Sequence, residues 1–206
     1  MARVSALTRR RPVLLFDVMD TLVHEPFHAE MPAFFRLSLE ELIAQKHPTA
    51  WLEFERGEIG EAEFLGRFFR DGRAFDRAAF KRTVVEAYRW IDGMEALVGE
   101  LAAGGFEIHA LSNYPEWFRA IEERLGLSRF LEWTFVSCLT GVRKPDARAF
   151  TGALDGLGVP AAECLFVDDR EANCAAARAV GIEALRFRSA AELRDALARR
   201  GLLRAG

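Results

Sequence analysis

Short, continuous apolar segments alternate with helical patterns along most of the chain. The apolar segments are residues 12–16, 106–111, 133–136, 164–167 and 183–187. Between them, apolar residues recur three and four positions apart, as in Met94, Leu97, Val98 and Leu101. Helices cover both faces of a parallel sheet, so its strands are apolar throughout rather than at alternate positions. The pattern therefore predicts an α/β fold with a doubly wound parallel sheet of five strands.

Residues 23–92 interrupt this alternation with a pattern that predicts helices only. Ser38 and Glu41 have the spacing of a capping box. Asp76 can cap a further helix, and the aromatic stripe in residues 64–69 is expected to form the centre of this unit. We therefore expect a core domain of residues 12–22 and 93–206, a helical cap domain of residues 23–92, and a flexible tail of residues 1–11.

Composition excludes several classes of protein. The chain has 206 residues, of which 50% are hydrophobic and 29% charged, which is typical of a folded globular protein. The formal net charge of −3 offers no basic surface for nucleic acid or an anionic membrane, and no apolar stretch is long enough to span a bilayer. An odd number of cysteines without a C-x-x-C pair is typical of a reducing compartment, so we expect a cytoplasmic protein. The oligomeric state is left open.

Polar residues follow the predicted strands at the positions where each strand ends. They are Asp17, Asp20 and Thr21 after the first, Ser112 and Asn113 after the second, Lys144 after the third, and Asp168 and Asp169 after the fourth. The carboxyl ends of parallel strands meet at one edge of the sheet, where such folds bind their ligands. We therefore expect these side chains to form one site.

The chemistry of that site follows from its residue types. Carboxylates that meet at one point repel each other unless a cation joins them, and hard oxygen ligands beside a lysine suit Mg²⁺ shared with a phosphate group. An aspartate in such a site can act as a nucleophile and form an aspartyl-phosphate. The expected ligand is a small phosphorylated molecule, with Mg²⁺ as the cofactor.

Four segments carry a resemblance to a known family. FDVMDTL, LSN, RKPD and FVDDREAN resemble, in order, the four motifs of the haloacid dehalogenase (HAD) superfamily, and the helical insert follows the first motif as in type-one caps. The resemblance implies a Rossmann-like core. The runs DVMDTLVHEPFHAEMPAFF, QKHPTAWLEFERGEI and FEIHALSNYPEW are further similar to a group that includes plant plastid flavin mononucleotide (FMN) hydrolases. That similarity implies FMN as the leading candidate substrate.

The resemblance also implies roles for individual residues. Asp17 would be the nucleophile and a Mg²⁺ ligand, and the backbone carbonyl of Met19 would be a second ligand. Asp169 would be the Mg²⁺ ligand of the fourth motif, with Asp168 supporting the metal directly or through water. Lys144 would neutralise charge on the nucleophile and on the phosphoryl group.

The phosphate-binding roles come from the same comparison of motifs. Thr21 and Ser112 would hold the phosphate, and Asn113 would orient the site.

One position departs from the pattern of HAD phosphatases. These enzymes typically carry a second aspartate two residues after the nucleophile, which protonates the leaving group and later activates water. Here that residue is Met19, which cannot exchange a proton. Loss of a general acid typically lowers the rate by about 10²–10⁴-fold. Asp20, His24, His28 or a metal-bound water are the candidate substitutes.

The departure at Met19 leaves two other functions open. One is a 2-haloacid dehalogenase, which needs no proton for its halide leaving group, although the pair Asp168 and Asp169 argues for a metal. The other is a catalytically weak HAD scaffold that binds a ligand or partner.

Some residues have a structural explanation as well. Asp169 could cap the helix 171–180, and Pro145 could open a helix as its first residue. Trp51 and Phe54 could face an aromatic ligand, although burial in the cap is the more common position for such side chains.

Overall fold

The computed structural model describes residues 11–204, and its centre is a sheet of five parallel strands in the order β3-β2-β1-β4-β5. The strands are β1 (Val13–Phe16), β2 (Ile108–Ser112), β3 (Glu132–Val136), β4 (Cys164–Asp168) and β5 (Glu183–Arg186). Each predicted apolar segment forms one strand, so the predicted α/β fold class is confirmed. Of the predicted tail, residues 1–10 lie outside the described residues.

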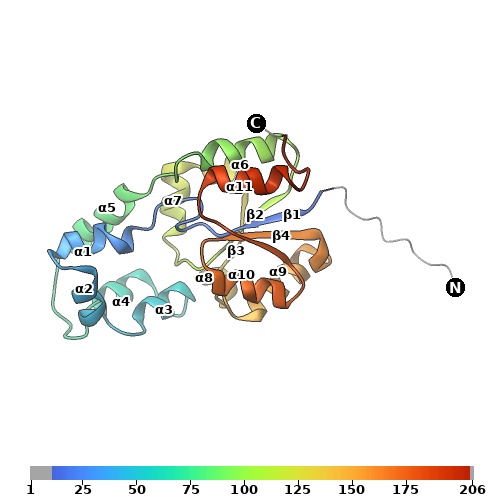
Figure 1. Ribbon diagram of the computed structural model, residues 1–206. Helices are drawn as coiled ribbons and strands as arrows, with labels where there is room; N and C mark the ends of the chain where they lie inside the picture. Colours follow the sequence, from blue (N-terminus) through green and yellow to red (C-terminus); the bar gives the residue numbers. More distant parts are fainter. Residues whose placement is uncertain (1–10, 205–206) are drawn as a thin grey trace.

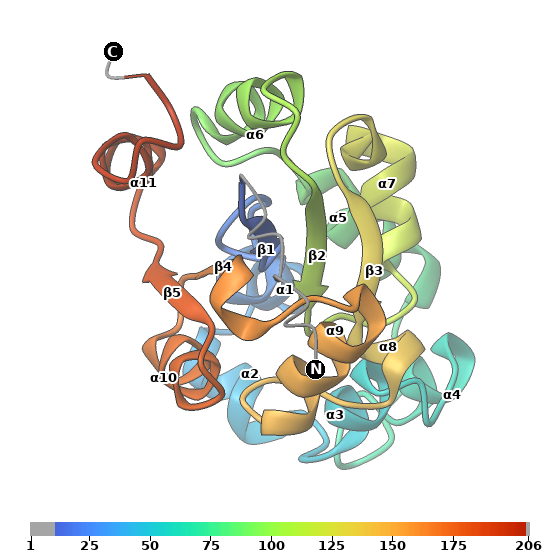
Figure 2. The same ribbon diagram turned by 90° about the vertical axis from the view of Figure 1, so that its right-hand side faces the viewer.

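Helices cover both faces of the sheet (Figure 2). Leu14 and Phe16 point to one face and Val13 and Leu15 to the other, each in a separate apolar cluster. The β1 residues of both clusters are buried, because helices cover both faces of a parallel sheet and leave neither face to solvent. The first face packs against α6 (Met94–Ala103), α7 (Phe118–Leu125) and α11 (Ala190–Ala198). The second packs against α9 (Ala147–Leu157) and α10 (Glu171–Ala179).

The described elements between β1 and α6 are all helices, and they lie at one end of the sheet (Figure 1). They are η1 (Pro26–His28), α1 (Glu30–Phe35), α2 (Leu39–Gln45), α3 (Ala50–Glu55), α4 (Glu61–Gly66) and α5 (Arg77–Ala87). The shorter elements α8 (Ser137–Thr140), η2 (Leu127–Arg129) and η3 (Ala161–Glu163) connect the strands and helices of the core.

Local sequence signals account for the helix starts in this insert. Ser38 and Glu41 form the predicted capping box of α2, and the Asp76 side chain accepts a hydrogen bond from the Ala79 amide at the start of α5. The predicted aromatic stripe is buried, with Phe68 packed against Phe35 and Phe80. The insert shares one apolar cluster with the α6 face of the sheet. We keep the division into a core domain and a cap domain of residues 23–92 as a proposal.

Two structural explanations from the sequence are wrong. Asp169 does not cap α10, whose N-cap is Arg170 without a side-chain hydrogen bond. Pro145 is not the first helical residue either, because α9 begins at Ala147 and is capped by the Asp146 side chain. Both residues therefore lie in loops that precede these helices.

No helix within residues 11–204 combines the length and the apolar character needed to cross a membrane.

Candidate active site

A tight turn after β1 places Asp17 at the end of the sheet. The Asp17 amide donates to the Val167 carbonyl at 2.9 Å, which continues the pairing of β1 with β4. The amides of Leu22 and Val23 then both donate to the Val18 carbonyl at 2.8 Å. The chain is thus folded back directly after the position of the predicted nucleophile, which holds Asp17 beside the end of β4.

Lys144 joins the first and fourth strand ends. Its Nζ donates to Asp17 Oδ1 at 2.8 Å and to Asp168 Oδ2 at 2.6 Å, and the residue is only 2% exposed. Asn113 fixes the lysine backbone through two hydrogen bonds of 2.8 Å, one to the Lys144 carbonyl and one from its amide. Three of the predicted strand ends therefore meet at one ammonium group.

Asp168 and Asp169 have different surroundings. The carboxylate of Asp168 is fully buried and accepts hydrogen bonds from the Arg170 amide and the Asn173 side chain as well as from Lys144. Asp169 is half-buried and lines a cavity. We infer that Asp169 is the better placed of the two to bind a metal directly, with Asp168 holding Lys144 in position.

The acidic side chains converge closely enough to share one ion. One carboxylate oxygen each of Asp17, Asp168 and Asp169 lies within 4.8 Å of the others. Burial raises the pKa of the Asp17 carboxyl to about 7, Asp168 and Asp169 act in the same direction, and Lys144 acts in the opposite one. A bound cation would favour the ionised form of Asp17. Hard oxygen donors in this arrangement fit Mg²⁺.

Lys144 keeps its charge in this site. Burial acts to lower the pKa of Lys144, but the ion pairs with Asp17 and Asp168 outweigh burial, and the net shift is upward. The ammonium group is thus available to neutralise a phosphoryl oxygen beside Asp17.

The two predicted phosphate-binding hydroxyls lie differently from each other. Ser112 Oγ is buried and has no hydrogen-bond partner among residues 11–204, so a ligand oxygen would satisfy it. The Thr21 hydroxyl is fully buried, accepts from the Asp169 amide at 3.2 Å and donates to Asp17 Oδ2 at 3.5 Å. In this position Thr21 orients Asp17. The predicted phosphate contacts of both residues stay predictions.

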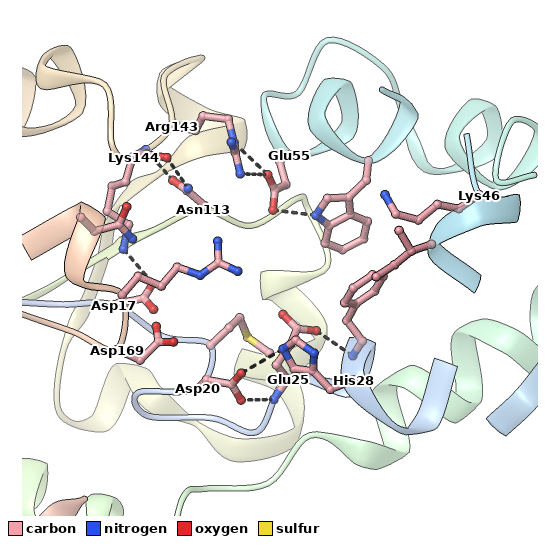
Figure 3. Close-up of a pocket in the computed structure, with 16 residues that line it drawn as sticks. Asp17, Asp20, Glu25, His28, Lys46, Glu55, Asn113, Arg143, Lys144 and Asp169 are labelled. Carbon is pink, nitrogen blue, oxygen red and sulfur yellow. Dashed lines mark hydrogen bonds and ion pairs between the residues drawn. The ribbon is translucent and has the colours of Figure 1, made fainter. Parts of the chain in front are cut away.

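A cavity of about 330 Å³ opens in front of Asp17 (Figure 3). The core lines it with Asp17, Met19, Asn113, Lys144 and Asp169, together with Arg143 and Arg170. The insert lines it with Glu25, Phe27, His28, Ile43, Lys46, Trp51 and Glu55. The insert thus forms the wall opposite the strand ends.

Of the two aromatic residues considered as ligand contacts, only Trp51 lines the cavity. Its Nε1 donates to Glu55 Oε1 at 2.6 Å, which fixes the indole ring at the cavity wall. Phe54 is 1% exposed and stacks on Phe64 at 4.7 Å between ring centroids, inside the insert.

The structure adds residues that the sequence pattern did not single out. Glu55 of α3 forms an ion pair with Arg143, with Nη2 at 2.8 Å from Oε2, so the insert is tied to the loop that carries Lys144. Arg170 lines the cavity beside Asp169, and Glu25 lines it beside Met19 and Asp20. Arg143 and Arg170 adjoin Lys144 and Asp169 in sequence, a signal that could have found them. Glu25 and Glu55 carry no such signal.

The candidate substitutes for the missing acid also have defined positions. Met19 lines the cavity where the resemblance places a general acid. Asp20 accepts from the Glu25 amide at 3.1 Å, and its Oδ2 lies 3.4 Å from His28 Nε2. His24 is bonded to Glu30 at 2.9 Å and is not part of the cavity lining.

Sequence comparison identifies phosphatases among the relatives of this chain. A family model for haloacid dehalogenase-like hydrolases matches residues 12–181. Flavin mononucleotide hydrolase 1, a chloroplast protein of Arabidopsis thaliana, is 45% identical over 194 residues, which is 94% of this chain and 79% of that protein. A phosphoglycolate phosphatase of Pseudomonas syringae is 31% identical over 82% of this chain and 66% of its own length.

Solved structures share the fold. A HAD-family enzyme of Bacteroides thetaiotaomicron, solved with magnesium and inorganic phosphate, has a TM-score of 0.71 at 18% identity over 87% of this chain and 95% of its own. An L-2-haloacid dehalogenase of Xanthobacter autotrophicus has a TM-score of 0.63 at 18% identity over 95% of this chain and 84% of its own. Given the match over residues 12–181, the chain belongs to the haloacid dehalogenase-like hydrolase family.

Proposed function

We propose that this hydrolase is a Mg²⁺-dependent phosphatase that acts on a small phosphorylated metabolite through an aspartyl-phosphate. The observation that carries the proposal is the position of Lys144 Nζ, 2.8 Å from Asp17 Oδ1 and 2.6 Å from Asp168 Oδ2, beside the half-buried carboxylate of Asp169. An acceptor carboxylate, a fixed positive charge and a set of hard metal ligands are what transfer of a phosphoryl group to aspartate requires.

In the first step, a carboxylate oxygen of Asp17 attacks phosphorus. A P–O bond to Asp17 forms, the P–O bond to the leaving oxygen breaks, and that oxygen takes up a proton. Lys144 holds Asp17 in place and offsets negative charge on the phosphoryl group. Thr21 donates to the other Asp17 oxygen and so limits rotation of the carboxylate.

In the second step, water attacks the phosphorus of the aspartyl-phosphate. The P–O bond to Asp17 breaks, inorganic phosphate leaves and the free carboxylate returns. Ser112 Oγ, which lacks a partner among the described residues, would donate to a phosphoryl oxygen, and the guanidinium of Arg170 would bind the phosphate from the cavity side.

The metal would be held by the Asp17 and Asp169 carboxylates and the Met19 carbonyl, with Asp168 behind them. When bound, Mg²⁺ would supply positive charge that draws the phosphate towards Asp17 and stabilises the charge that develops during transfer.

FMN is the leading candidate substrate. The support is the 45% identity to a flavin mononucleotide hydrolase together with the insert side of the cavity. There, Trp51, Phe27 and Ile43 offer apolar surface and Lys46 a positive charge, so the wall suits a large aromatic leaving group. The cavity volume lies in the range of small-molecule sites.

The rival functions have less support. Displacement of halide from carbon needs no metal, so it leaves the acidic cluster at Asp169 without a role. A binding scaffold leaves the Lys144 bridge to Asp17 without a role. We also propose a cytoplasmic location, in contrast to the chloroplast relative. Expression of a tagged full-length chain followed by cell fractionation tests the location.

One assay separates the three functions. Purified protein is incubated with FMN, other phosphomonoesters and 2-chloropropionate, each with and without Mg²⁺. We expect phosphate release from FMN when Mg²⁺ is present and no release when it is absent. Chloride release without metal would establish the dehalogenase, and no turnover of any compound, together with binding of FMN, would establish the scaffold.

A further inference from the structure

The proposed phosphatase reaction needs a proton for its leaving group, and Met19 cannot supply one. An alkoxide such as the riboflavin oxygen of FMN leaves slowly unless it is protonated as the P–O bond breaks. The donor has to lie on the cavity wall, within reach of the leaving oxygen, and carry an exchangeable proton. Few of the described cavity residues meet these conditions.

We propose that Glu25 is the general acid of this enzyme, in place of the aspartate that Met19 replaces. The inference rests on the phosphatase function proposed above.

The backbone brings Glu25 next to the position that Met19 occupies. Met19 pairs with Val23 in a parallel bridge, so the segment that continues to Glu25 runs alongside the turn after β1. The Glu25 amide donates to Asp20 Oδ1 at 3.1 Å, which ties the two segments together. Both Met19 and Glu25 line the cavity in front of Asp17. Figure 3 shows Glu25 beside Asp20 and His28.

One oxygen of the Glu25 carboxyl is held by a hydrogen bond, and the other is free to contact a ligand in the cavity. Oε1 accepts from the Phe27 amide at 3.1 Å at the start of η1, which fixes the side chain. The hydrogen bond that this carboxyl accepts from the described residues goes to Oε1, and Glu25 is a partly exposed residue of the cavity wall. A carboxyl fixed through one oxygen can present the other to the leaving group.

The surroundings of Glu25 favour its protonated form. Burial raises the pKa of Glu25 to about 8, and Asp20, Glu55 and Asp17 act in the same direction against the hydrogen bond from Phe27. At neutral pH the carboxyl therefore carries a proton that it can donate. The acids that face it are Asp17 and Asp20 from the turn after β1 and Glu55 from α3. The tyrosines that face it are Tyr88 after α5 and Tyr114 after β2. His28 and Lys46 lie on the same cavity wall.

The other candidate donors are engaged in contacts of their own or lie outside the cavity lining. Asp20 accepts from the Glu25 amide through one oxygen and lies against His28 through the other. Glu55 accepts from Trp51 and pairs with Arg143. His24 is bonded to Glu30 outside the cavity lining.

The proton balance closes over the two steps. In the first, the Glu25 proton moves to the leaving oxygen as its bond to phosphorus breaks, so a neutral alcohol departs and Glu25 becomes a carboxylate. In the second, Glu25 accepts a proton from the water that attacks the aspartyl-phosphate. Glu25 ends the cycle protonated.

The test compares Glu25→Gln with wild type on two esters in the presence of Mg²⁺. FMN has an alkyl leaving group, whereas 4-nitrophenyl phosphate releases a phenolate that needs no proton. We expect kcat on FMN to fall by about 10²–10⁴-fold and kcat on the aryl ester to stay close to wild type. The fall in wild-type FMN turnover above about pH 8 should be absent from Glu25→Gln.

Two further variants separate proton donation from a structural role. Glu30→Gln changes an acid of the same insert that does not line the cavity, and it should turn over both esters like wild type. Met19→Asp, added to Glu25→Gln, restores an acid at the position where relatives carry one, and it should recover FMN turnover selectively.

The outcomes distinguish the two proposals. Equal loss on both esters, or no loss on FMN, overturns the role of Glu25 and leaves the phosphatase standing. A wild-type protein that cleaves only the aryl ester also overturns it, because then no group supplies the proton. If wild type cleaves neither ester, the phosphatase function fails, and the role of Glu25 fails with it.

Discussion

Lys144 is the residue whose position most constrains the chemistry. It is buried between the carboxylates of Asp17 and Asp168, and its backbone is clamped by Asn113. A buried ammonium group is tolerated only when it is paired, so the two aspartates and the lysine form one unit. Removal of Lys144 would leave both carboxylates without their ion-pair partner, whereas removal of either aspartate leaves the lysine paired with the other.

Asp17→Asn tests the nucleophile at this scale. The amide has the size of the carboxylate but cannot attack phosphorus, so we expect phosphatase activity to fall to background with the fold retained. Steady-state turnover and circular dichroism measure the two effects. Wild type trapped with fluoroberyllate should carry the adduct on Asp17. Undiminished turnover of the variant would assign the nucleophile to another residue.

Asp169→Asn tests the metal site. Asp169 is the open carboxylate of the acidic cluster, so its neutralisation should weaken Mg²⁺ binding strongly. Isothermal titration calorimetry on wild type and variant measures the affinity directly. The Mg²⁺-dependent rise in Tm should also shrink, because a ligand stabilises the folded state in proportion to its binding. Asp155→Asn, on the exposed surface of α9, serves as the matched control. Equal Mg²⁺ affinity in Asp169→Asn and wild type would rule out Asp169 as a ligand.

Among the elements, α3 links the insert side of the cavity to the core. Its Trp51 and Glu55 face the cavity from the insert, and Glu55 reaches across to Arg143. The Glu55 carbonyl also accepts a hydrogen bond from Ser137 at the start of α8. This helix therefore holds the aromatic wall at a defined position relative to Lys144.

Trp51→Leu tests the contribution of that wall. If the indole contacts the flavin ring, KM for FMN should rise by about two- to tenfold, since an aromatic pair contributes about 0.5–1.5 kcal/mol beyond its buried area. KM for a small aliphatic phosphate should change little. Trp51→Phe keeps an aromatic face and should recover most of the affinity. An equal rise in KM for both substrates would mean that the substitution disturbs the cavity as a whole.

For the molecule as a whole, buried acids make stability depend on pH. The pKa of Glu25 is raised from its ordinary value of 4.5 to about 8, so the folded state binds more protons than the unfolded state between these values. Its stabilising contribution is complete below the lower value and is lost as the pH rises through the upper one.

Urea denaturation without metal tests this pH dependence. Between about pH 5 and pH 8, wild type should lose more free energy of unfolding than Glu25→Gln, which cannot ionise. Glu30→Gln should follow the wild-type profile above about pH 5, because the pKa of Glu30 is lowered rather than raised. Parallel profiles for wild type and Glu25→Gln would show that Glu25 does not titrate in this range.

The five strands and the residues at the centre of the site were predictable from the sequence pattern. Apolar runs of strand length that alternate with helical patterns are typical of a parallel sheet between two helical layers, so β1 to β5 were predictable from the sequence pattern. The parallel direction of the strands then brings their carboxyl ends together. For that reason Asp17, Lys144 and Asp169 could be grouped from positions up to 152 residues apart.

Which side chains of the insert face the cavity depends on contacts between segments that are distant in the sequence. Trp51 and Phe54 lie three residues apart on one helix, yet one lines the cavity and the other packs on Phe64. Glu25 is an ordinary acid in the sequence, and its raised pKa comes from burial and from carboxylates on other segments. Desolvation and charge pairing depend on contacts between segments that are distant in the sequence, and the local pattern of residues does not predict those contacts.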